Sequence, residues 1–418
     1  MPARFISGEA VPTDGAVEMT VRSLQEAFQA CGEDLRKDES FARYYIARED
    51  GASLELAERM AMDKRPVKAL FAGQKGAGKT TELLRVVRDC VGTLYPVYIP
   101  MDHIHEKSGI PELLSAIGLG MLKKLQADKI NLSDAVMRSL LAWLKDALKV
   151  PGDEKGGVSG VTDIFAKLSE KLKKKEARAE IAAALESRRD ELASKLTELA
   201  NDVKARTNRE VLLVIDGTER LGKTQALMFL LESSLLDLGF KTICTVPFQL
   251  LHSAEFRDLR KAFDLIAVQP LVDISTQVRG LPKGATDLRD MVDKRVGGEL
   301  VDSSALDQLI QNSGGNPGEL LRFLGSCCIK ASMQGKSRIE ARTVEQVLED
   351  FRLEMKRFLS AEEWHRLTQI QRDRNTPSDE TLSSLLESGA VLEFPGKKDM
   401  YQVHPALLPV LKERMAGA

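Results

Sequence analysis

The sequence has 418 residues, of which 43% are hydrophobic and 29% are charged, with a formal net charge of −2. This composition supports packed cores, and the length suggests roughly two to four domains. The near-neutral charge excludes a general attraction to nucleic acid, although it allows a local basic patch. The five cysteines match no zinc or disulfide frame, and no apolar run approaches the roughly 18 residues of a membrane span. We therefore expect a cytoplasmic protein with reduced thiols and no membrane contact.

The N-terminal part is expected to be a loose arm followed by helices. Residues 1–15 are rich in Gly and Pro, and helical patterns follow at Val17–Ala30, Phe41–Ile46 and Ser53–Met62. Tyr44 stands with Tyr45 shortly before the motif described next.

A glycine-rich motif of the form GxxxxGKT runs from Gly73 to Thr80. It follows the apolar run Val67–Ala72, which is short enough for one buried strand, and it precedes a segment with helical spacing. Strand, glycine loop and helix are the context of a phosphate-binding P-loop, because glycines let consecutive N–H groups face phosphate oxygens. We predict nucleotide contacts from the whole loop: Gly73, Gln74, Lys75, Gly76, Ala77, Gly78, Lys79, Thr80 and Thr81.

Two side chains of this loop have predicted chemical roles. Lys79 is expected to reach the β- and γ-phosphates, and the Thr80 hydroxyl to ligate Mg²⁺. A chance glycine-rich turn is the alternative, which the flanking strand and helix disfavour. Tyr44 and Tyr45 either stack on the nucleotide base or pack in the core.

The next segment predicts a second strand, Leu94–Pro100, closed by Asp102. His103 and His105 follow; two histidines without a third ligand nearby are interpreted as surface or packing residues, with a metal site as the minor alternative. Residues 110–206 are helical and too long for an ordinary connection between strands, so they predict a helical insertion.

Two features of this insertion allow alternatives. An apolar stripe between 181 and 203 is suited to pairing with another helix, in the same chain or in a neighbouring subunit. The lysines between 171 and 175 are interpreted as solvated helix surface, with nucleic-acid or membrane contact as the alternative.

A second apolar run, Val211–Ile215, ends in Asp216. A buried parallel strand would carry this acid to the sheet edge at which α/β proteins bind ligands. Asp216 is therefore expected to share the Mg²⁺ site with Thr80, and Glu219 to orient or deprotonate the attacking water. The pattern is weak alone, because many buried strands end in Asp, but it is strong when it follows a P-loop.

Further candidates have two interpretations each. Thr245 ends the β-rich run Phe240–Val246, where it either senses the γ-phosphate or is a plain strand-end threonine. Arg257 and Arg260, in the predicted helix Ser253–Phe263, either act as an arginine finger in a neighbouring subunit's site or are solvated.

A helical region is predicted from residue 287 to about 333, interrupted by the turn Ser313–Pro317. In a lid over the nucleotide, this turn would set Pro317 against adenine and Arg322 toward the phosphates. A plain helix-opening turn is an equal alternative.

The C-terminal part predicts helices and a β-hairpin. Capping boxes begin at Thr343 and Ser360, a third helix spans Asp379–Glu387, and residues 389–404 form the hairpin. This arrangement resembles a winged helix.

The would-be recognition helix of this winged helix has three acids and no Lys or Arg. DNA contacts from it are therefore disfavoured, because phosphate neutralisation needs basic side chains, and only Lys397 and Lys398 at the wing tip are suited to it. We favour a regulatory or protein-contact role.

The P-loop, Asp216-Gly217-Thr218-Glu219, Gly314-Gly315-Asn316-Pro317 and the winged helix together resemble the AAA+/STAND branch of P-loop ATPases, over about residues 40–415. Gly217 with the acid at Glu219 looks like STAND and NACHT proteins, and Gly-Gly-Asn-Pro looks like the STAND GxP motif. The sequence departs from the STAND pattern in two places. An arginine that usually follows the threonine after the fourth strand is missing from Thr245-Val246-Pro247, and the insertion at 110–206 has no counterpart that can be named.

We predict an α/β fold: a P-loop NTPase core with a parallel sheet, a large helical insertion, a helical lid and a C-terminal winged helix. The expected parts are an N-terminal arm with helices (1–63), the core (64–272, with the insertion at 110–206), the lid (273–337) and the winged-helix-like domain (338–418).

The resemblance implies a slow, ATP- and Mg²⁺-dependent switch that forms homo-oligomers and signals to a separate effector or sensor protein, with bacterial antiviral defence as a setting. A DNA-binding ATPase of the initiator or transposition-regulator type is the alternative. A nucleotide-binding scaffold without turnover is a third.

Overall fold

The computed structural model describes residues 23–48, 51–102, 110–148, 183, 185, 187–232, 235–274, 277–278, 281–373, 379–395 and 400–416. Several predicted features lie outside these residues: the N-terminal arm, His103 and His105, the lysines between 171 and 175, and Lys397 and Lys398. Within the described residues, no helix is long and apolar enough to cross a membrane.

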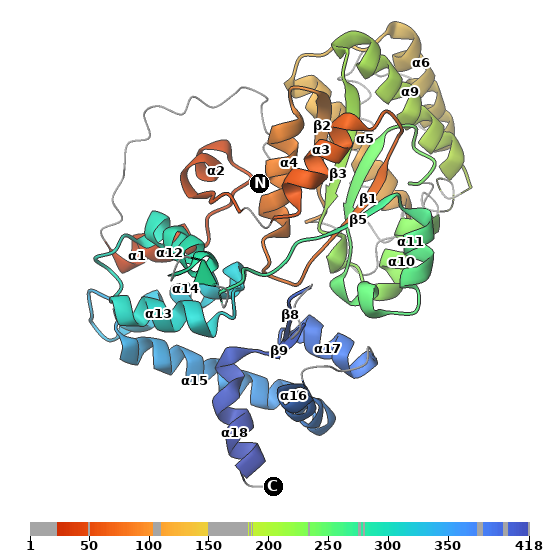
Figure 1. Cartoon of the computed structure of the whole chain (residues 1–418). Coiled ribbons are helices and arrows are strands. Elements are labelled where there is room, and N and C mark those ends of the chain that lie inside the picture. The colour runs from red at the N-terminus through yellow and green to blue at the C-terminus, as the bar shows by residue number, and fades with distance from the viewer. Residues whose placement is uncertain are drawn as a thin grey trace.

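A five-stranded parallel sheet forms the centre of the larger part of the molecule (Figure 1). Its strand order is β2-β3-β4-β1-β5, and every neighbouring pair is parallel. The strands are β1 (Lys68–Ala72), β2 (Leu94–Pro100), β3 (Glu210–Asp216), β4 (Lys241–Thr245) and β5 (Leu265–Val268). The carboxyl ends of parallel strands meet at one edge, so the segments after β1, β3 and β4 lie close together. The predicted α/β fold with a P-loop core is confirmed.

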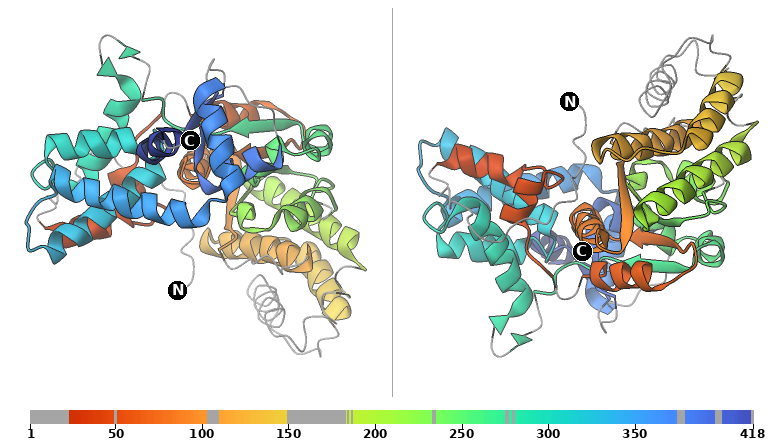
Figure 2. Two further views of the ribbon diagram at one scale, coloured as in Figure 1. Left: turned by 90° about the horizontal axis from the view of Figure 1, so that it is seen from below. Right: turned by 90° about the horizontal axis from the view of Figure 1, so that it is seen from above.

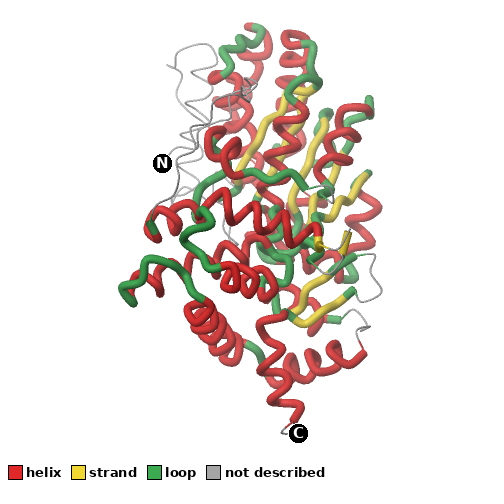
Figure 3. Tube along the Cα trace, turned by 60° about the vertical axis from the view of Figure 1, so that its left-hand side comes forward, coloured by secondary structure: helices red, strands yellow, loops and turns green. Residues whose placement is uncertain are grey.

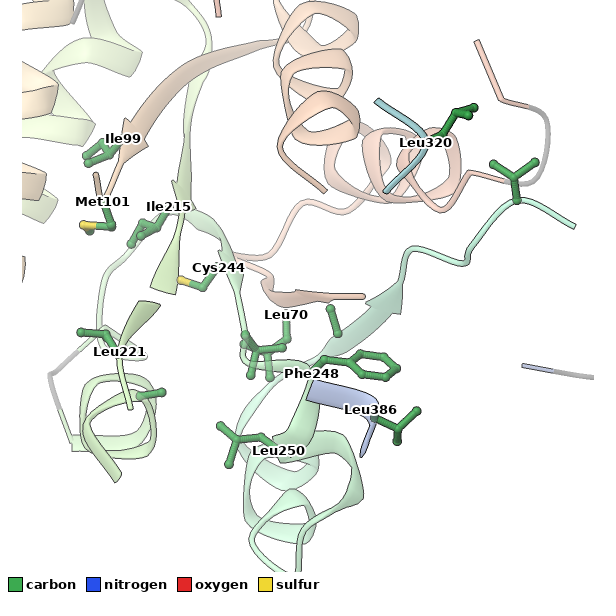
Figure 4. Packing of buried hydrophobic residues seen from close by; sticks show 14 of the residues in the cluster. Leu70, Ile99, Met101, Ile215, Leu221, Cys244, Phe248, Leu250, Leu320 and Leu386 are labelled. Atoms are coloured by element: carbon green, nitrogen blue, oxygen red, sulfur yellow. The ribbon is translucent and has the colours of Figure 1, made fainter. Parts of the chain in front are cut away.

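Helices cover both faces of the sheet, because alternate side chains of a strand point in opposite directions. Phe71 and Val214 pack with α3 (Ser53–Met62) and α4 (Lys79–Cys90). Leu70, Leu213 and their neighbours on the other face belong to the larger core (Figure 4). Burial on both faces explains why these strands are apolar throughout. Figure 3 shows the strands lying between helical layers.

The described part of the segment between β2 and β3 is mainly helical, as predicted. Its described helices are α5 (Ile110–Ala127), α6 (Asp134–Leu148) and α9 (Arg189–Thr207). The part of the apolar stripe on α9 is buried against β3, α5 and α6, so it pairs within this chain. Figure 2 shows these helices on the side of the sheet away from α13.

Two groups of helices pack together beside the sheet (Figure 1). The N-terminal helices are α1 (Leu24–Cys31) and α2 (Asp38–Tyr44). The helices after the core are α12 (Lys283–Val296), α13 (Ser303–Asn312) and α14 (Pro317–Met333). Because α1 packs along α14 and α2 contacts α12, chain segments more than 200 residues apart form one unit. The short helices η1 (Thr218–Arg220) and η2 (Phe248–His252) follow β3 and β4, and α10 (Lys223–Glu232) and α11 (Phe256–Ala262) come after them in turn. The two-residue strands β6 (Gln277–Val278) and β7 (Leu281–Pro282) form a small hairpin, and β7 contacts α12.

The C-terminal elements occur in the predicted order. They are α15 (Ala341–Phe358), α16 (Ala361–Asp373), α17 (Glu380–Ser388), β8 (Val391–Glu393), β9 (Tyr401–Val403), η3 (Pro405–Leu407) and α18 (Leu408–Ala416). We call residues 379–416 the C-terminal module; its assignment as part of a winged helix stays a prediction.

One of the two predicted capping boxes is confirmed. The Glu363 N–H donates to Ser360 Oγ at 3.2 Å, and the Ser360 N–H donates to the Glu363 carboxylate at 2.8 Å. The box at Thr343 is wrong, because α15 already begins at Ala341. Backbone hydrogen bonds hold Ile339 beside Leu300 and Asp302 in an extended pairing, and the helix starts directly after it.

Stability at acidic pH is expected to depend on His404. Its ring is fully buried against Phe323 and Phe351, and burial, with Arg322 nearby, lowers the pKa of His404 to about 3. The unfolded chain has an ordinary histidine pKa of about 6.5. Between these values the unfolded state binds the extra proton, so the free energy of unfolding falls as the pH drops below 6.5, by up to about 1.4 kcal/mol per unit.

Urea denaturation of the native protein and of His404→Gln, from pH 7 down to pH 5, tests this. The variant is expected to be less stable at pH 7 but to lose stability less steeply as the pH falls. Equal slopes for the two proteins would contradict the assignment.

Candidate active site

The Gly73–Thr80 motif joins β1 to α4 and lines a cavity of about 770 Å³. Gly76 (φ 85°) and Gly78 (φ 92°) have the left-handed backbone that favours glycine. No described protein group accepts a hydrogen bond from the N–H of Gly78, Lys79 or Thr80. The first N–H groups of α4 are therefore available to an anion, with the positive end of the helix dipole behind them.

The carbonyl groups of the same loop, in contrast, all have donors. The pairs are Lys79 Nζ to Gly73 (2.9 Å) and Gln74 (3.3 Å), Asn316 Nδ2 to Lys75 (2.9 Å), Gly318 N–H to Gly76 (2.9 Å) and Arg48 Nη1 to Ala77 (3.1 Å). The loop is thus held from its carbonyl side, while the N–H groups of Gly78, Lys79 and Thr80 have no partner in the described part of the chain.

Asp216 lies at the end of β3, beside Thr80, and is 5% exposed. Tyr98 donates its hydroxyl to Oδ2 at 2.6 Å, whereas the buried Oδ1 has no hydrogen-bond partner among the described residues. Burial, together with the charge of Glu219, raises the pKa of Asp216, while Tyr98, Thr80 and Lys79 act in the opposite direction. The carboxylate is therefore in a position that favours a nearby cation.

The two predicted magnesium ligands fit this ion chemically. An orphaned carboxylate oxygen beside a threonine hydroxyl suits Mg²⁺, which commonly takes few protein ligands and completes its shell with phosphate and water. Among the described residues, no group of three or more His, Cys, Asp or Glu offers a self-sufficient metal site. Thr80 and Asp216 would therefore hold the ion only together with a bound nucleotide.

Glu219 lies on η1 and lines the cavity, with Oε1 3.8 Å from Lys79 Nζ. Thr245, at the end of β4, supports the turn that carries it. Its Oγ1 accepts the N–H groups of Gly217 and Thr218 at 2.9 Å each, and it is fully buried. Thr245 is not among the lining residues, so its contact in this structure is with the turn before Glu219.

The remaining walls of the cavity come from other parts of the chain. Tyr44 and Tyr45 line it, as does Pro317 of the predicted lid. Arg295 of α12 stacks over the Tyr44 ring at 5.0 Å, which fixes that wall. The full wall from α12 and α14 consists of Asp287, Leu288, Met291, Arg295, Pro317, Gly318 and Leu321.

Besides Asp216 and Thr245, four predicted site residues do not line the cavity. Arg322 pairs with Glu319 at 2.7 Å and stacks over Phe323, outside the cavity. Arg257 and Arg260 are exposed on α11 and do not line the cavity. The side chain of Gln74 points away from the cavity, toward the C-terminal module.

Several functional candidates carried no clear sequence signal. Arg48 holds the loop and also donates to Pro270 O at 2.8 Å, yet it lies in an unremarkable segment. Tyr98 lies in the predicted strand Leu94–Pro100, where no sequence pattern assigned it a separate role. The pairing of β2 with β3 brings it beside Asp216. Asn316 was visible in the Gly-Gly-Asn-Pro turn, but its partner Lys75 is 241 positions away.

The turn before α14 is attached to the core at Gly315. This glycine has φ +79°, its carbonyl accepts the Val272 N–H at 2.8 Å, and an added Cβ would lie 1.9 Å from Val272 O. We expect Gly315→Ala to lower the free energy of unfolding by at least about 2 kcal/mol, from strain and steric clash together.

Gly335→Ala is the matched control, because Gly335 also has positive φ (+69°) but nothing within 4 Å of an added Cβ. It should lower the free energy of unfolding by only about 1 kcal/mol. Equal losses in urea denaturation would show that the contact with Val272 is unimportant.

No protein-family model matches the sequence, and no curated protein matches it. Solved structures with similar folds include the RuvB Holliday junction branch migration motor of Thermotoga maritima (TM-score 0.38, 13% identity, covering 88% of this chain and 95% of that one). A second is the ORC2 protein of Aeropyrum pernix, in ADPNP–ADP complexes (TM-score 0.41, 13% identity, covering 90% of this chain and 98% of that one). A third is Cdc6p of Pyrobaculum aerophilum (TM-score 0.39, 12% identity, covering 91% of this chain and 98% of that one).

Proposed function

We propose that this protein binds ATP with Mg²⁺ in the cavity and hydrolyses it slowly. The observation that supports this most is one juxtaposition: free N–H groups at the start of α4, Lys79, the Thr80–Asp216 pair and Glu219 meet at one sheet edge. These are the groups that phosphoryl transfer to water requires, namely a phosphate cradle, charge neutralisation and a base.

Each residue would have a distinct part in this reaction. The loop N–H groups would bind phosphate oxygens, and Lys79 would exchange its hydrogen bonds to Gly73 and Gln74 for the β- and γ-phosphates. Mg²⁺, held by Thr80 and Asp216, would neutralise charge on the phosphates when bound. Glu219 would orient or deprotonate the water, and its 3.8 Å distance from Lys79 supports a position near the γ-phosphate.

We further propose that the ATPase is a molecular switch of the AAA+/STAND type that forms homo-oligomers. Its support is that the N-terminal segment, the core, the predicted lid and the C-terminal module all contribute to the cavity wall. Occupancy of one site would then bias the positions of several parts of the chain. In an oligomer, the exposed Arg257 or Arg260 would reach a neighbour's phosphates. A separate effector in bacterial antiviral defence remains the proposed setting.

A DNA-binding ATPase of the initiator type is the alternative. In this structure, however, the candidate recognition helix α17 packs against η2, where Leu386 lies beside Phe248 (Figure 4), and Glu387 lines the cavity. DNA contact through this helix would require it to leave the core. ATP-dependent binding to duplex DNA at about 150 mM salt, weakening steeply as salt rises, would favour the alternative.

The proposed function is tested by titrating the purified protein with a fluorescent ATP analogue and by measuring phosphate release with and without Mg²⁺. We expect saturable binding and slow, Mg²⁺-dependent release. Binding without release would leave a nucleotide-binding scaffold, and the absence of binding would overturn the proposal.

A further inference from the structure

Gln74, the second residue of the P-loop motif, connects that loop to the C-terminal module. Its side chain is 4% exposed and makes three hydrogen bonds to backbone groups more than 300 positions away. Nε2 donates to Leu386 O at 3.3 Å and to Val391 O at 2.9 Å, while Oε1 accepts the Glu393 N–H at 2.8 Å. Both ends of the amide are used, so no smaller or apolar residue can replace it without leaving buried groups unpaired.

Other contacts of the same interface surround these bonds. The Glu393 carboxylate also lies 2.8 Å from His252 Nε2, and both side chains are 10% exposed. Ala77 of the loop packs in a small cluster with Leu271, Leu392 and Phe394. The C-terminal module therefore contacts the phosphate loop itself, by polar and apolar groups together.

We propose that Gln74 is a positioning residue through which the docked C-terminal module completes the phosphate site. The Gln74 side chain ties the loop to the module, and Asn316 holds the Lys75 carbonyl. The N–H groups at the start of α4 have no partner among the described residues. A loop fixed in this way loses less conformational freedom when phosphate binds. Nucleotide binding and docking of the module then strengthen each other by the same factor, because linkage is reciprocal.

One charge acts against this coupling. Glu387 lines the cavity next to Leu386 and would repel a bound phosphate. It is exposed to solvent, so the repulsion is screened. The three hydrogen bonds of the buried Gln74 amide therefore keep the module docked against this repulsion when nucleotide is bound.

The inference rests on the proposed nucleotide site and is tested with two variants of the full chain. Gln74→Met keeps the side-chain length and removes the three bonds, and should weaken ATP and ADP binding about tenfold. His252→Phe keeps a ring beside Phe248 but removes the polar contact with Glu393. His252 lies outside the loop and the cavity wall. If docking of the module supports the phosphate site, His252→Phe should also weaken ATP and ADP binding, about threefold. The double variant should then lose less affinity than the product of the two single-variant factors, because both substitutions disturb the same interface.

Hydrogen exchange supplies a readout that does not depend on nucleotide affinity. Without nucleotide, Gln74→Met should speed exchange in residues 391–394, and ADP or ATP should slow it in the native protein. Native affinity in His252→Phe, or faster exchange on adding nucleotide, would overturn the inference while leaving the proposed ATPase intact. Failure of the native protein to bind nucleotide would instead overturn the proposed function.

Discussion

Replacing Glu219 by Gln is expected to slow phosphate release by about 10²–10³-fold, the usual contribution of a general base. The amide has the same size but cannot take a proton from water. ATP affinity should change little, by less than about threefold, because the substitution removes an interaction needed only in the transition state. Single-turnover phosphate release and ATP titration, measured on the same preparation, separate the two effects.

The control for this experiment is Glu255→Gln, at an acid that pairs with Lys223 and does not line the cavity. Its rate should stay within about twofold of native, as for an exposed ion pair of little energetic weight. If Glu219→Gln also retains the native rate, Glu219 is not the base, and another carboxylate must be sought at this edge.

Replacing Lys79 by Ala is expected to weaken ATP binding by at least about 100-fold, since a charge-assisted contact to two phosphates is worth about 3 kcal/mol or more. Its ammonium is buried and donates to the carbonyls of Gly73 and Gln74, so it lies next to the place where the phosphates would bind. Isothermal titration with ATP, and separately with ADP and Mg²⁺, measures the loss.

Lys75→Ala is the matched comparison within the loop. Lys75 also lines the cavity, but its side chain is exposed, so its removal should weaken ATP binding less than about tenfold. Thermal unfolding without nucleotide checks that Lys79→Ala is folded. A folded variant that binds ATP as tightly as Lys75→Ala would contradict the central role of Lys79.

The local patterns of the sequence determined the core of this protein. A buried strand followed by GxxxxGKT and a helical spacing can form little else, because the glycines take left-handed backbone and the apolar strand must be covered on both faces. The strand that ends at Asp216 was predictable from its continuous apolar run. The helical insertion before it was predictable from its helical spacing and its length. These features depend on residues close together in the chain, where propensity and spacing act directly.

Only the tertiary structure decided which distant groups meet the loop. The direction of the Gln74 side chain, the bond from Asn316 to Lys75 and the position of Arg322 outside the cavity all depend on how separate units pack, and a single sequence carries no signal for that. The predicted helix start at Thr343 was wrong for a similar reason. The pairing of Ile339 with Leu300, which are distant in the sequence, sets the start of α15 at Ala341. Short-range spacing determines elements, whereas hydrogen bonds between buried groups hundreds of positions apart determine which surfaces meet.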